Sequence, residues 1–286
     1  MNVVFFCIGA AKAGTSWLHR QLTQHPQCHL RSIKELHYFD ALEGDQMKRE
    51  LSKHRDLQKD MLNRLVRNGS APDVLLGQKL ADRAAWLDVL EAGREDVPAY
   101  LDYLNDGAAP GQVVGEVTPA YALLPEKRLR VMARITDDVR FFYMLRDPVE
   151  RLWSHVRMSA ARRDDQGRVT PERTSRILQR VISGAEPQIA DRGDYAGALA
   201  RLSAAVPGPQ VLVEAIENMV AGNGLRRLCG FLGIAPMTGD LQPVHAGLPL
   251  DMTRDQRKAA ADWLAPQYDA AERALGSLPK AWLREG

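Results

Sequence analysis

Two stretches of the chain are apolar almost throughout and short enough to be buried β-strands. They cover residues 3–8 and 139–145, and the first reads Val-Val-Phe-Phe-Cys-Ile. Strands covered on both faces of a parallel sheet show such unbroken apolar runs, rich in β-branched and aromatic residues. The pattern therefore predicts buried strands at these two places, and further strands are predicted over 112–116 and 210–214.

Between these runs, apolar residues recur at helical spacing. The first predicted helix begins at Thr15, a helical segment begins at Thr118, and a capping box at Thr253 opens one long final helix. The other predicted helices cover residues 45–67, 86–104 (with a break at Pro98), 125–134, 148–162, 171–184, 194–205 and 225–232. Strands that alternate with helices favour an α/β fold with a parallel sheet. No internal repeat or low-complexity linker divides the sequence, so residues 1–286 are predicted to form a single domain.

Composition narrows the class of protein. An apolar share of 45% with 26% charged residues is typical of a globular chain, and a net charge of +2 predicts neither a nucleic-acid binder nor a membrane-surface protein. Cys7, Cys28 and Cys229 form neither a disulfide framework nor a metal-binding pair. No apolar run reaches membrane-spanning length, and the N-terminal run lacks the basic start of a signal peptide, which predicts a cytoplasmic protein.

The loop after the first predicted strand is made of small residues and one lysine. It reads Gly-Ala-Ala-Lys-Ala-Gly over residues 9–14, and Thr15-Ser16 then begin a helix. Small side chains let backbone N–H groups approach an anion, and the positive end of the helix dipole faces it. A Walker A loop has lysine directly after its second glycine, but Thr15 stands there and Lys12 lies inside the loop. The alternative is a turn whose glycines only permit close packing.

A second candidate segment follows the strand over 139–145. Pro148 suits the first position of a helix and Asp147 the cap before it, and this helix places Ser154 on the same side as the loop that carries Arg146. Because ligands bind at the carboxyl ends of parallel strands, Lys12 and Arg146 are expected to reach one ligand. A guanidinium beside a hydroxyl suits a phosphate monoester. The alternative is a surface ion pair of Arg146 with Asp147 or Glu150.

Together these segments resemble the sulfotransferases that use 3′-phosphoadenosine 5′-phosphosulfate (PAPS). Residues 12–16 resemble the K-x-G-T-S loop that binds the 5′-phosphosulfate, and residues 146–154 resemble the R-[DN]-P-x-x-R-x-[WY]-S motif that binds the 3′-phosphate. Residues 34–40 and 115–121 are similar to the K-E-x-H-[FY]-F and G-E-K-[ST]-P-x-Y segments of the carbohydrate and heparan-type branch, although Val117 replaces a lysine. The resemblance spans nearly the whole chain and implies a three-layer, P-loop-like α/β fold.

The resemblance also implies roles for individual residues. PAPS would be the donor, with Lys12, Ala13, Gly14, Thr15 and Ser16 around its phosphosulfate. Arg146 and Ser154 would hold its 3′-phosphate, which distinguishes it from ATP. No metal is implied, and the seven histidines show no metal-ligand spacing.

The acceptor is expected to be a hydroxyl or amine of a carbohydrate or natural product, and it needs a base. Glu35 matches the catalytic glutamate of the resembled branch, and burial beside Tyr38 and Phe39 is expected to raise its pKa. His37 is the second candidate, because the natural pKa of histidine suits a base. Either residue could instead be a loop residue paired with Lys34 or Arg31.

Three further expectations remain open in the sequence. Glu116 is a further candidate base, although a role in orienting the site or in pairing with Lys12 is the first expectation for it. A P-loop kinase that uses ATP is the first alternative function, although its Walker lysine is absent. A catalytically silent nucleotide- or glycan-binding module on the same fold is the second, because a fold alone does not establish activity.

Overall fold

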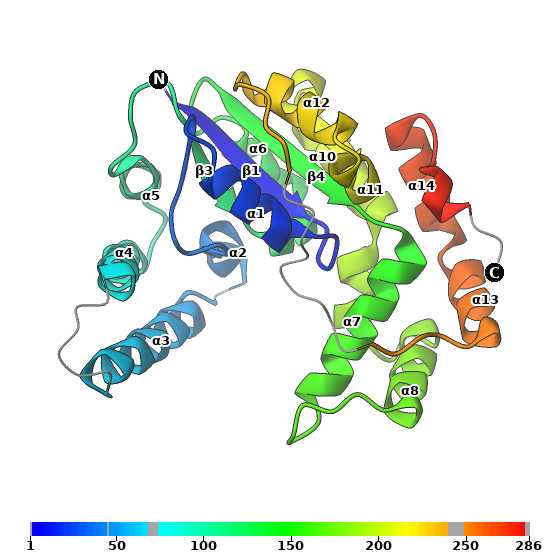
Figure 1. Ribbon diagram of the computed structural model, residues 1–286. Coiled ribbons are helices and arrows are strands. Elements are labelled where there is room, and N and C mark those ends of the chain that lie inside the picture. The colour runs from blue at the N-terminus through cyan, green and yellow to red at the C-terminus, as the bar shows by residue number, and fades with distance from the viewer. Residues whose placement is uncertain (1, 45, 68–73, 240–248, 284–286) are drawn as a thin grey trace.

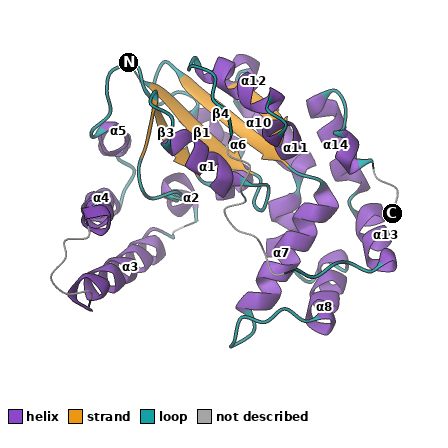
Figure 2. Ribbon diagram, in the orientation of Figure 1, coloured by secondary structure: helices purple, strands orange, loops and turns teal. Residues whose placement is uncertain are grey.

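The structure, a computed structural model, describes residues 2–44, 46–67, 74–239 and 249–283 (Figure 1). In this part of the chain five parallel strands form one sheet in the order β2-β3-β1-β4-β5. They are β1 (Val3–Gly9), β2 (Cys28–Leu30), β3 (Val113–Val117), β4 (Val139–Leu145) and β5 (Val211–Ala215). Helices lie on both faces of the sheet (Figure 2), which confirms the predicted three-layer α/β fold.

Strand β1 lies at the centre of the sheet and divides its side chains between the two faces. Val4, Phe6 and Ile8 belong to the apolar cluster on one face, and Phe5 and Cys7 belong to the cluster on the other. This alternation follows from the two-residue period of a strand. Both clusters exclude solvent from β1, which explains why the sequence shows an unbroken apolar run there.

Two sets of helices cover the sheet, and a third cluster joins the helices beyond its edge. Helices α1 (Thr15–Thr23) and α12 (Asn223–Leu232) pack on the face that carries Phe5. The opposite face carries α2 (Tyr38–Glu43), α5 (Val97–Asn105), α6 (Glu126–Met132), α10 (Tyr195–Ala205) and α14 (Ala265–Leu275). Helices α7 (Pro148–Arg162), α8 (Pro171–Ile182) and α13 (Arg254–Trp263) share the third apolar cluster.

The remaining helices are short or lie away from the sheet. Helices α3 (Met47–Arg67) and α4 (Val74–Glu91) run side by side at one end of the molecule (Figure 1). The others are α9 (Pro187–Ala190), α11 (Ile216–Val220) and the 3₁₀ turns η1 (Pro119–Leu123), η2 (Asp191–Gly193), η3 (Gly208–Gln210) and η4 (Lys280–Trp282). None of the helices in the described ranges is long and apolar enough to cross a membrane.

Several predicted boundaries are wrong, each for a local reason. Strand β2 and helix α2 lie in a stretch whose mixed charge and short length gave no periodic signal. The predicted helix over 86–104 is two helices, because α4 ends at Glu91 and Asp96 caps α5 by accepting a hydrogen bond from the Ala99 N–H. The predicted long final helix is also two, since Pro266 stands in the first turn of α14 and cannot continue α13. The segment after Thr118 is a 3₁₀ turn.

The order of the strands determines where a ligand can bind. From β1 the chain moves to β2 and β3 on one side, and it then crosses to β4 on the other side of β1. At such a reversal the loops beyond the strands diverge and leave a crevice at their carboxyl ends. The loops that carry Lys12 and Arg146 follow β1 and β4 directly, so both leave the sheet at this point.

Candidate active site

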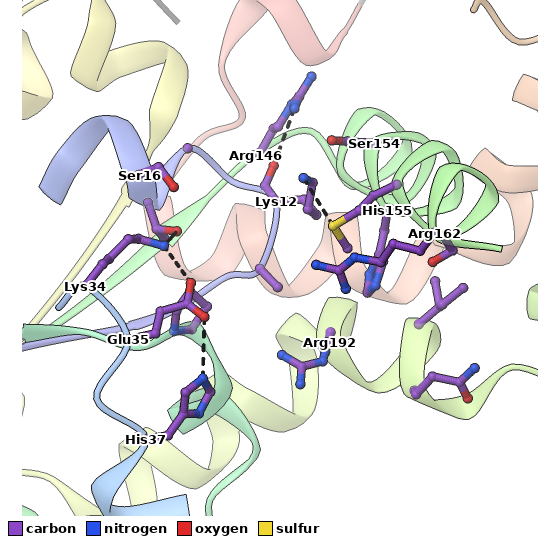
Figure 3. A pocket seen from close by; sticks show the side chains of 18 of the residues that line it. Lys12, Ser16, Lys34, Glu35, His37, Arg146, Ser154, His155, Arg162 and Arg192 are labelled. Atoms are coloured by element: carbon purple, nitrogen blue, oxygen red, sulfur yellow. Dashed lines mark hydrogen bonds and ion pairs between the residues drawn. The ribbon is translucent and has the colours of Figure 1, made fainter. Parts of the chain in front are cut away.

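A cavity of about 910 Å³ opens at the carboxyl ends of β1 and β4. Its walls come from the loop after β1, the segment before α2, the start of α3, helix α7 and the α9–η2 turn (Figure 3). The residues predicted from the sequence that line it are Lys12, Gly14, Thr15, Ser16, Glu35, His37, Arg146 and Ser154. Ala13 is the exception, because its side chain is fully buried behind the loop. The fold therefore brings both candidate segments to one cavity.

The loop after β1 presents backbone donors to this cavity. Gly14 caps α1 with a φ of +94°, a conformation that favours glycine, and no side chain caps the helix. Among the described residues, the N–H groups of Gly14, Thr15 and Ser16 have no protein acceptor. Free N–H groups at the positive end of a helix dipole bind anions. The loop therefore fits a phosphate or sulfate group.

Lys12 has an unusual backbone, and its amine has no carboxylate partner among the described residues. In the described ranges, Lys12 (φ 72°) and His37 (φ 56°) are the two non-glycine residues with left-handed backbone, and both line the cavity. Such backbone costs free energy and tends to occur at functional sites. The Lys12 Nζ lies 3.6 Å from the Met158 Sδ. Burial, together with the positive charges of Arg162 and Arg146, lowers the pKa of Lys12.

Helix α7 begins as the sequence predicts and positions the second candidate group. The Asp147 side chain accepts a hydrogen bond from the Glu150 N–H at 2.8 Å, and Pro148 stands in the first turn. The Arg146 Nη1 donates to the Lys12 carbonyl oxygen at 3.4 Å, while its Nη2 lies 3.7 Å from the Glu150 Oε2. The alternative ion pair with Glu150 is thus present beside the contact with the loop. It does not withdraw Arg146 from the cavity.

Glu35 and His37 form a chain of charged contacts on the opposite wall. The Glu35 Oε2 lies 3.5 Å from the His37 Nε2, and the Asp40 Oδ2 lies 2.7 Å from the His37 Nδ1. The Lys34 Nζ donates to the Glu35 Oε1 at 2.7 Å and to the Thr15 Oγ1 at 3.3 Å. Figure 3 shows Lys34, Glu35 and His37 along one side of the cavity.

Because of these contacts, neither base candidate has the pKa expected from the sequence, which was a raised pKa for Glu35 and an ordinary one for His37. Burial does favour the neutral form of Glu35, but the His37 hydrogen bond and the Lys34 charge outweigh it and hold the pKa of Glu35 at about 2. Burial opposes the charged form of His37, yet its bonds to Asp40 and Glu35 raise its pKa to about 9. The side chains of Tyr38 and Phe39 pack into the apolar core and not around Glu35. At neutral pH, Glu35 is therefore ionised and His37 is protonated.

Glu116 lies beneath the segment that carries Glu35. The expected pairing of Glu116 with Lys12 is wrong. Its buried carboxylate accepts hydrogen bonds from the hydroxyls of Tyr100 at 2.6 Å, of Tyr121 at 2.8 Å and of Thr118. It also accepts the Leu36 N–H at 3.3 Å, and this bond ties it to the segment that carries Glu35. Burial raises the pKa of Glu116 despite these hydrogen bonds.

Several cations of the cavity were not assigned from the sequence. Lys34 stands within a motif that the sequence did show, whereas Arg49, Lys53, Arg162 and Arg192 reach the cavity only through the packing of α3, α7 and the α9–η2 turn. No short motif surrounds these arginines. In the described part of the chain, no group of three or more His, Cys, Asp or Glu side chains is arranged to hold a metal ion.

The sequence profile of the sulfotransferase family matches residues 5–236, which is most of the chain. The chain belongs to the sulfotransferase family. The predicted family is thereby confirmed, and it supports sulfuryl transfer as the class of reaction. The match includes both the loop after β1 and the start of α7. A search of the curated proteins finds no match.

Solved sulfotransferase structures share the fold at low sequence identity. A sulfotransferase from Alicyclobacillus acidocaldarius is 21% identical, with a TM-score of 0.65 over 99% of this chain and 100% of that one. The sulfotransferase domain of the Synechococcus PCC 7002 olefin synthase is 19% identical, with a TM-score of 0.53 over 97% of this chain and 96% of that one. The sulfotransferase domain of the curacin biosynthetic pathway is 18% identical, with a TM-score of 0.56 over 98% of this chain and 99% of that one.

Proposed function

We propose that this member of the sulfotransferase family transfers the sulfuryl group of PAPS to a hydroxyl or amine of a small acceptor, a carbohydrate or another natural product. The observation that supports this most is the contact of Arg146 with the Lys12 carbonyl oxygen, at 3.4 Å in one cavity. Two anion-binding segments that meet in this way suit a nucleotide with a charged group on each side of its ribose.

The residues of the cavity fit such a donor. The uncapped start of α1 offers the N–H groups of Gly14, Thr15 and Ser16 to the 5′-phosphosulfate, and Lys12 offers a positive charge beside it. Arg146 and Ser154, on the other wall, suit the 3′-phosphate. When bound, the donor supplies the sulfuryl group and a phosphate leaving group. A cation held beside the leaving oxygen stabilises the negative charge that develops there, and this is the role proposed for Lys12.

Glu35 is the proposed base, and His37 the residue that holds it. The Glu35 carboxylate is ionised at neutral pH and can accept a proton, whereas His37, with a pKa of about 9, cannot until it is deprotonated. A carboxylate with a pKa of about 2 is a weak base. Glu35 therefore takes the proton while the bond between the acceptor and sulfur forms. The acceptor's O–H or N–H becomes far more acidic as its oxygen or nitrogen bonds to sulfur.

The proposed transfer balances without another reactant. A bond forms between the acceptor oxygen or nitrogen and sulfur, and the bond between sulfur and the 5′-phosphate oxygen breaks with its electron pair on that oxygen. The acceptor proton moves to Glu35. Adenosine 3′,5′-bisphosphate and a sulfated acceptor are the products. The chain's contribution is alignment of the reactants and compensation of charge.

The test of this proposal compares two nucleotides and then looks for turnover. Adenosine 3′,5′-bisphosphate should raise the melting temperature of the protein, and ATP with Mg²⁺ should raise it far less, because Arg146 and Ser154 suit a 3′-phosphate. Incubation with PAPS and an acceptor panel should then release adenosine 3′,5′-bisphosphate and give sulfated products by mass spectrometry. Stabilisation by ATP alone would contradict the proposal and favour a kinase. Binding of the bisphosphate without any turnover would favour a silent module.

A further inference from the structure

Beyond the proposed donor residues, the cavity continues along one face of α7. Ser154, Met158 and Arg162 follow one another at four-residue spacing, so they share a face of the helix, and all three line the cavity. At a rise of about 1.5 Å per residue, Arg162 lies roughly 12 Å along the axis from Ser154. The Lys12 Nζ contacts Met158, which lies between them. Lys12 therefore separates the end of the cavity proposed for the 3′-phosphate from the end that holds Arg162.

A second arginine reaches this far end from a different element. Arg192 belongs to the 3₁₀ turn η2, and Figure 3 shows it and Arg162 extending into the cavity from the side opposite Lys34, Glu35 and His37. Both guanidinium groups thus face the region where an acceptor would lie between Lys12 and the proposed base.

Buried Arg151 holds the backbone on both sides of Arg192. Its side chain is 1% exposed, and its Nη2 donates to the Ile189 carbonyl oxygen at 3.5 Å. On the other side, a Cβ at Gly193 would collide with the same guanidinium, so glycine permits the close packing there. The turn that carries Arg192 is therefore packed on a buried side chain and is not a loose surface loop.

Among the described residues, Arg162 and Arg192 have no acidic partner of the kind that neighbouring arginines have. Arg163 and Arg180 both pair with the Glu186 carboxylate, and Arg257 pairs with Glu150. Within the described ranges, neither Arg162 nor Arg192 makes an ion pair with a carboxylate. Burial and the positive charges of Arg151, Arg192 and Arg162 lower the pKa of His155 to about 3. Two cations in a cavity that have no ion pair with a described carboxylate attract an anionic ligand.

We propose that Arg162 and Arg192 form a subsite for an anionic group on the acceptor, so that the acceptor is a hydroxyl or amine compound that also carries a carboxylate, a phosphate ester or a sulfate ester. This inference rests on the proposed function, since it takes the donor to occupy the α1 end of the cavity. The donor's own charges are matched there by the free N–H groups of the loop, Lys12 and Arg146. The positive charge beyond Lys12 is left for the acceptor.

The test measures binding of matched neutral and anionic probes to the protein loaded with adenosine 3′,5′-bisphosphate. The pairs are 4-hydroxybenzoate with 4-hydroxybenzamide, and glucose 6-phosphate with glucose, each titrated by calorimetry. In at least one pair the anionic member should bind about tenfold or more tighter than its neutral partner, which is the effect of one charged hydrogen bond. Arg162→Gln and Arg192→Gln should each reduce this preference, and the double variant should lose it.

Controls separate the acceptor subsite from the donor site. Arg176→Gln removes the same charge from an exposed position on α8 outside the cavity, and it should leave every probe unaffected. Affinity for adenosine 3′,5′-bisphosphate should stay within about twofold of wild type in the double variant, because no donor contact is removed. Melting curves of all variants should match wild type, since neither the Arg162 nor the Arg192 side chain forms an ion pair within the described ranges.

The inference would be overturned by equal binding of both members in both pairs, by failure of both anionic probes to bind at millimolar concentration, or by an unchanged preference in the double variant. A loss of bisphosphate affinity in the double variant would assign the two arginines to the donor and also overturn it, while leaving the proposed function intact. Failure of wild type to bind the bisphosphate would instead defeat the proposed function, and the probe titrations on the free protein would still test the arginines.

Discussion

The Arg146 Nη1 donates a hydrogen bond to the Lys12 carbonyl oxygen at 3.4 Å, although 134 positions separate the two residues in the chain. The contact exists because β1 and β4 are neighbours in a parallel sheet, so the loops beyond their carboxyl ends meet. It places the guanidinium and the loop that carries the lysine against one cavity. The proposed two-ended grip on a nucleotide depends on this relationship.

Replacement of Arg146 tests the proposed 3′-phosphate site. Arg146→Ala removes a charged hydrogen-bond donor from the cavity, so affinity for adenosine 3′,5′-bisphosphate should fall by about 2–3 kcal/mol. Calorimetric titration measures this directly. Arg176→Ala, at an exposed position on α8, is the matched control and should bind like wild type. Equal affinity of both variants would remove Arg146 from the donor site.

Replacement of Lys12 tests the proposed stabilisation of the leaving group. Lys12→Ala should lower the rate of transfer by at least about a hundredfold, which is the typical effect of losing one group that compensates developing charge. The rate is measured as release of adenosine 3′,5′-bisphosphate with a sulfated acceptor. Lys79→Ala, at an exposed position on α4, should retain full activity. Wild-type turnover in Lys12→Ala would mean that the loop after β1 has another role.

The Glu35–His37 pair should make stability depend on pH. The pKa of His37 is raised to about 9, so its contribution is complete below pH 6.5 and is lost as the pH rises through 9. The pKa of Glu35 is lowered to about 2, so its contribution is complete above pH 4.5 and is lost as the pH falls through 2. The loss of unfolding free energy in His37→Gln should therefore be largest between pH 4.5 and 6.5.

Urea unfolding at a series of pH values, with NMR titration of the His37 imidazole, checks this expectation. His29→Gln is the control, because the His29 imidazole contacts the Asp106 backbone carbonyl and no carboxylate side chain in the described ranges. A His37 midpoint near 6.5 would show that the pair does not form in solution.

The Tyr121 hydroxyl should hold the segment that carries the proposed base. It donates to the Glu116 carboxylate at 2.8 Å and accepts the N–H groups of Tyr38 at 3.0 Å and Phe39 at 3.3 Å. Tyr121→Phe takes this acceptor from the Tyr38 and Phe39 N–H groups and one of several donors from Glu116, and it should lower the unfolding free energy by about 1–3 kcal/mol. It should also shift the titration midpoint of His37, because α2 begins directly after that residue.

Tyr103→Phe is the matched control for this variant. Its hydroxyl donates to the Asp82 carboxylate at 2.8 Å, away from the cavity lining. The two variants should lose similar stability in urea unfolding, and only Tyr121→Phe should move the His37 midpoint. A shift of equal size in both would show that Tyr121 has a general packing role.

The sequence was most informative where one local signal determined one local structure. Short runs of mostly apolar residues identified β1, β4 and β5, and Asp147 with Pro148 identified the start of α7. The meeting of Lys12 and Arg146 could also be predicted, because parallel strands bring their carboxyl ends to one edge of a sheet. That reasoning needs only the order of strand, loop and helix.

Features that depend on tertiary packing could not be predicted. The three-residue strand β2 is defined by its pairing with β3 and not by its own sequence. The pKa of Glu35 falls because the left-handed backbone at His37 and the fold of residues 34–40 surround it with cations, and no pattern in the sequence gives that geometry. The turn that brings Arg192 to the cavity packs on buried Arg151 at Ile189 and Gly193, and these contacts are not visible in the sequence.

The most direct measurement of the central claim is a crystal structure of the protein with adenosine 3′,5′-bisphosphate. The account predicts one bound molecule, with its 5′-phosphate against the N–H groups of Gly14, Thr15 and Ser16, and its 3′-phosphate against Arg146 and Ser154. A nucleotide that contacts only one of these two segments, or that binds outside the cavity, would contradict it.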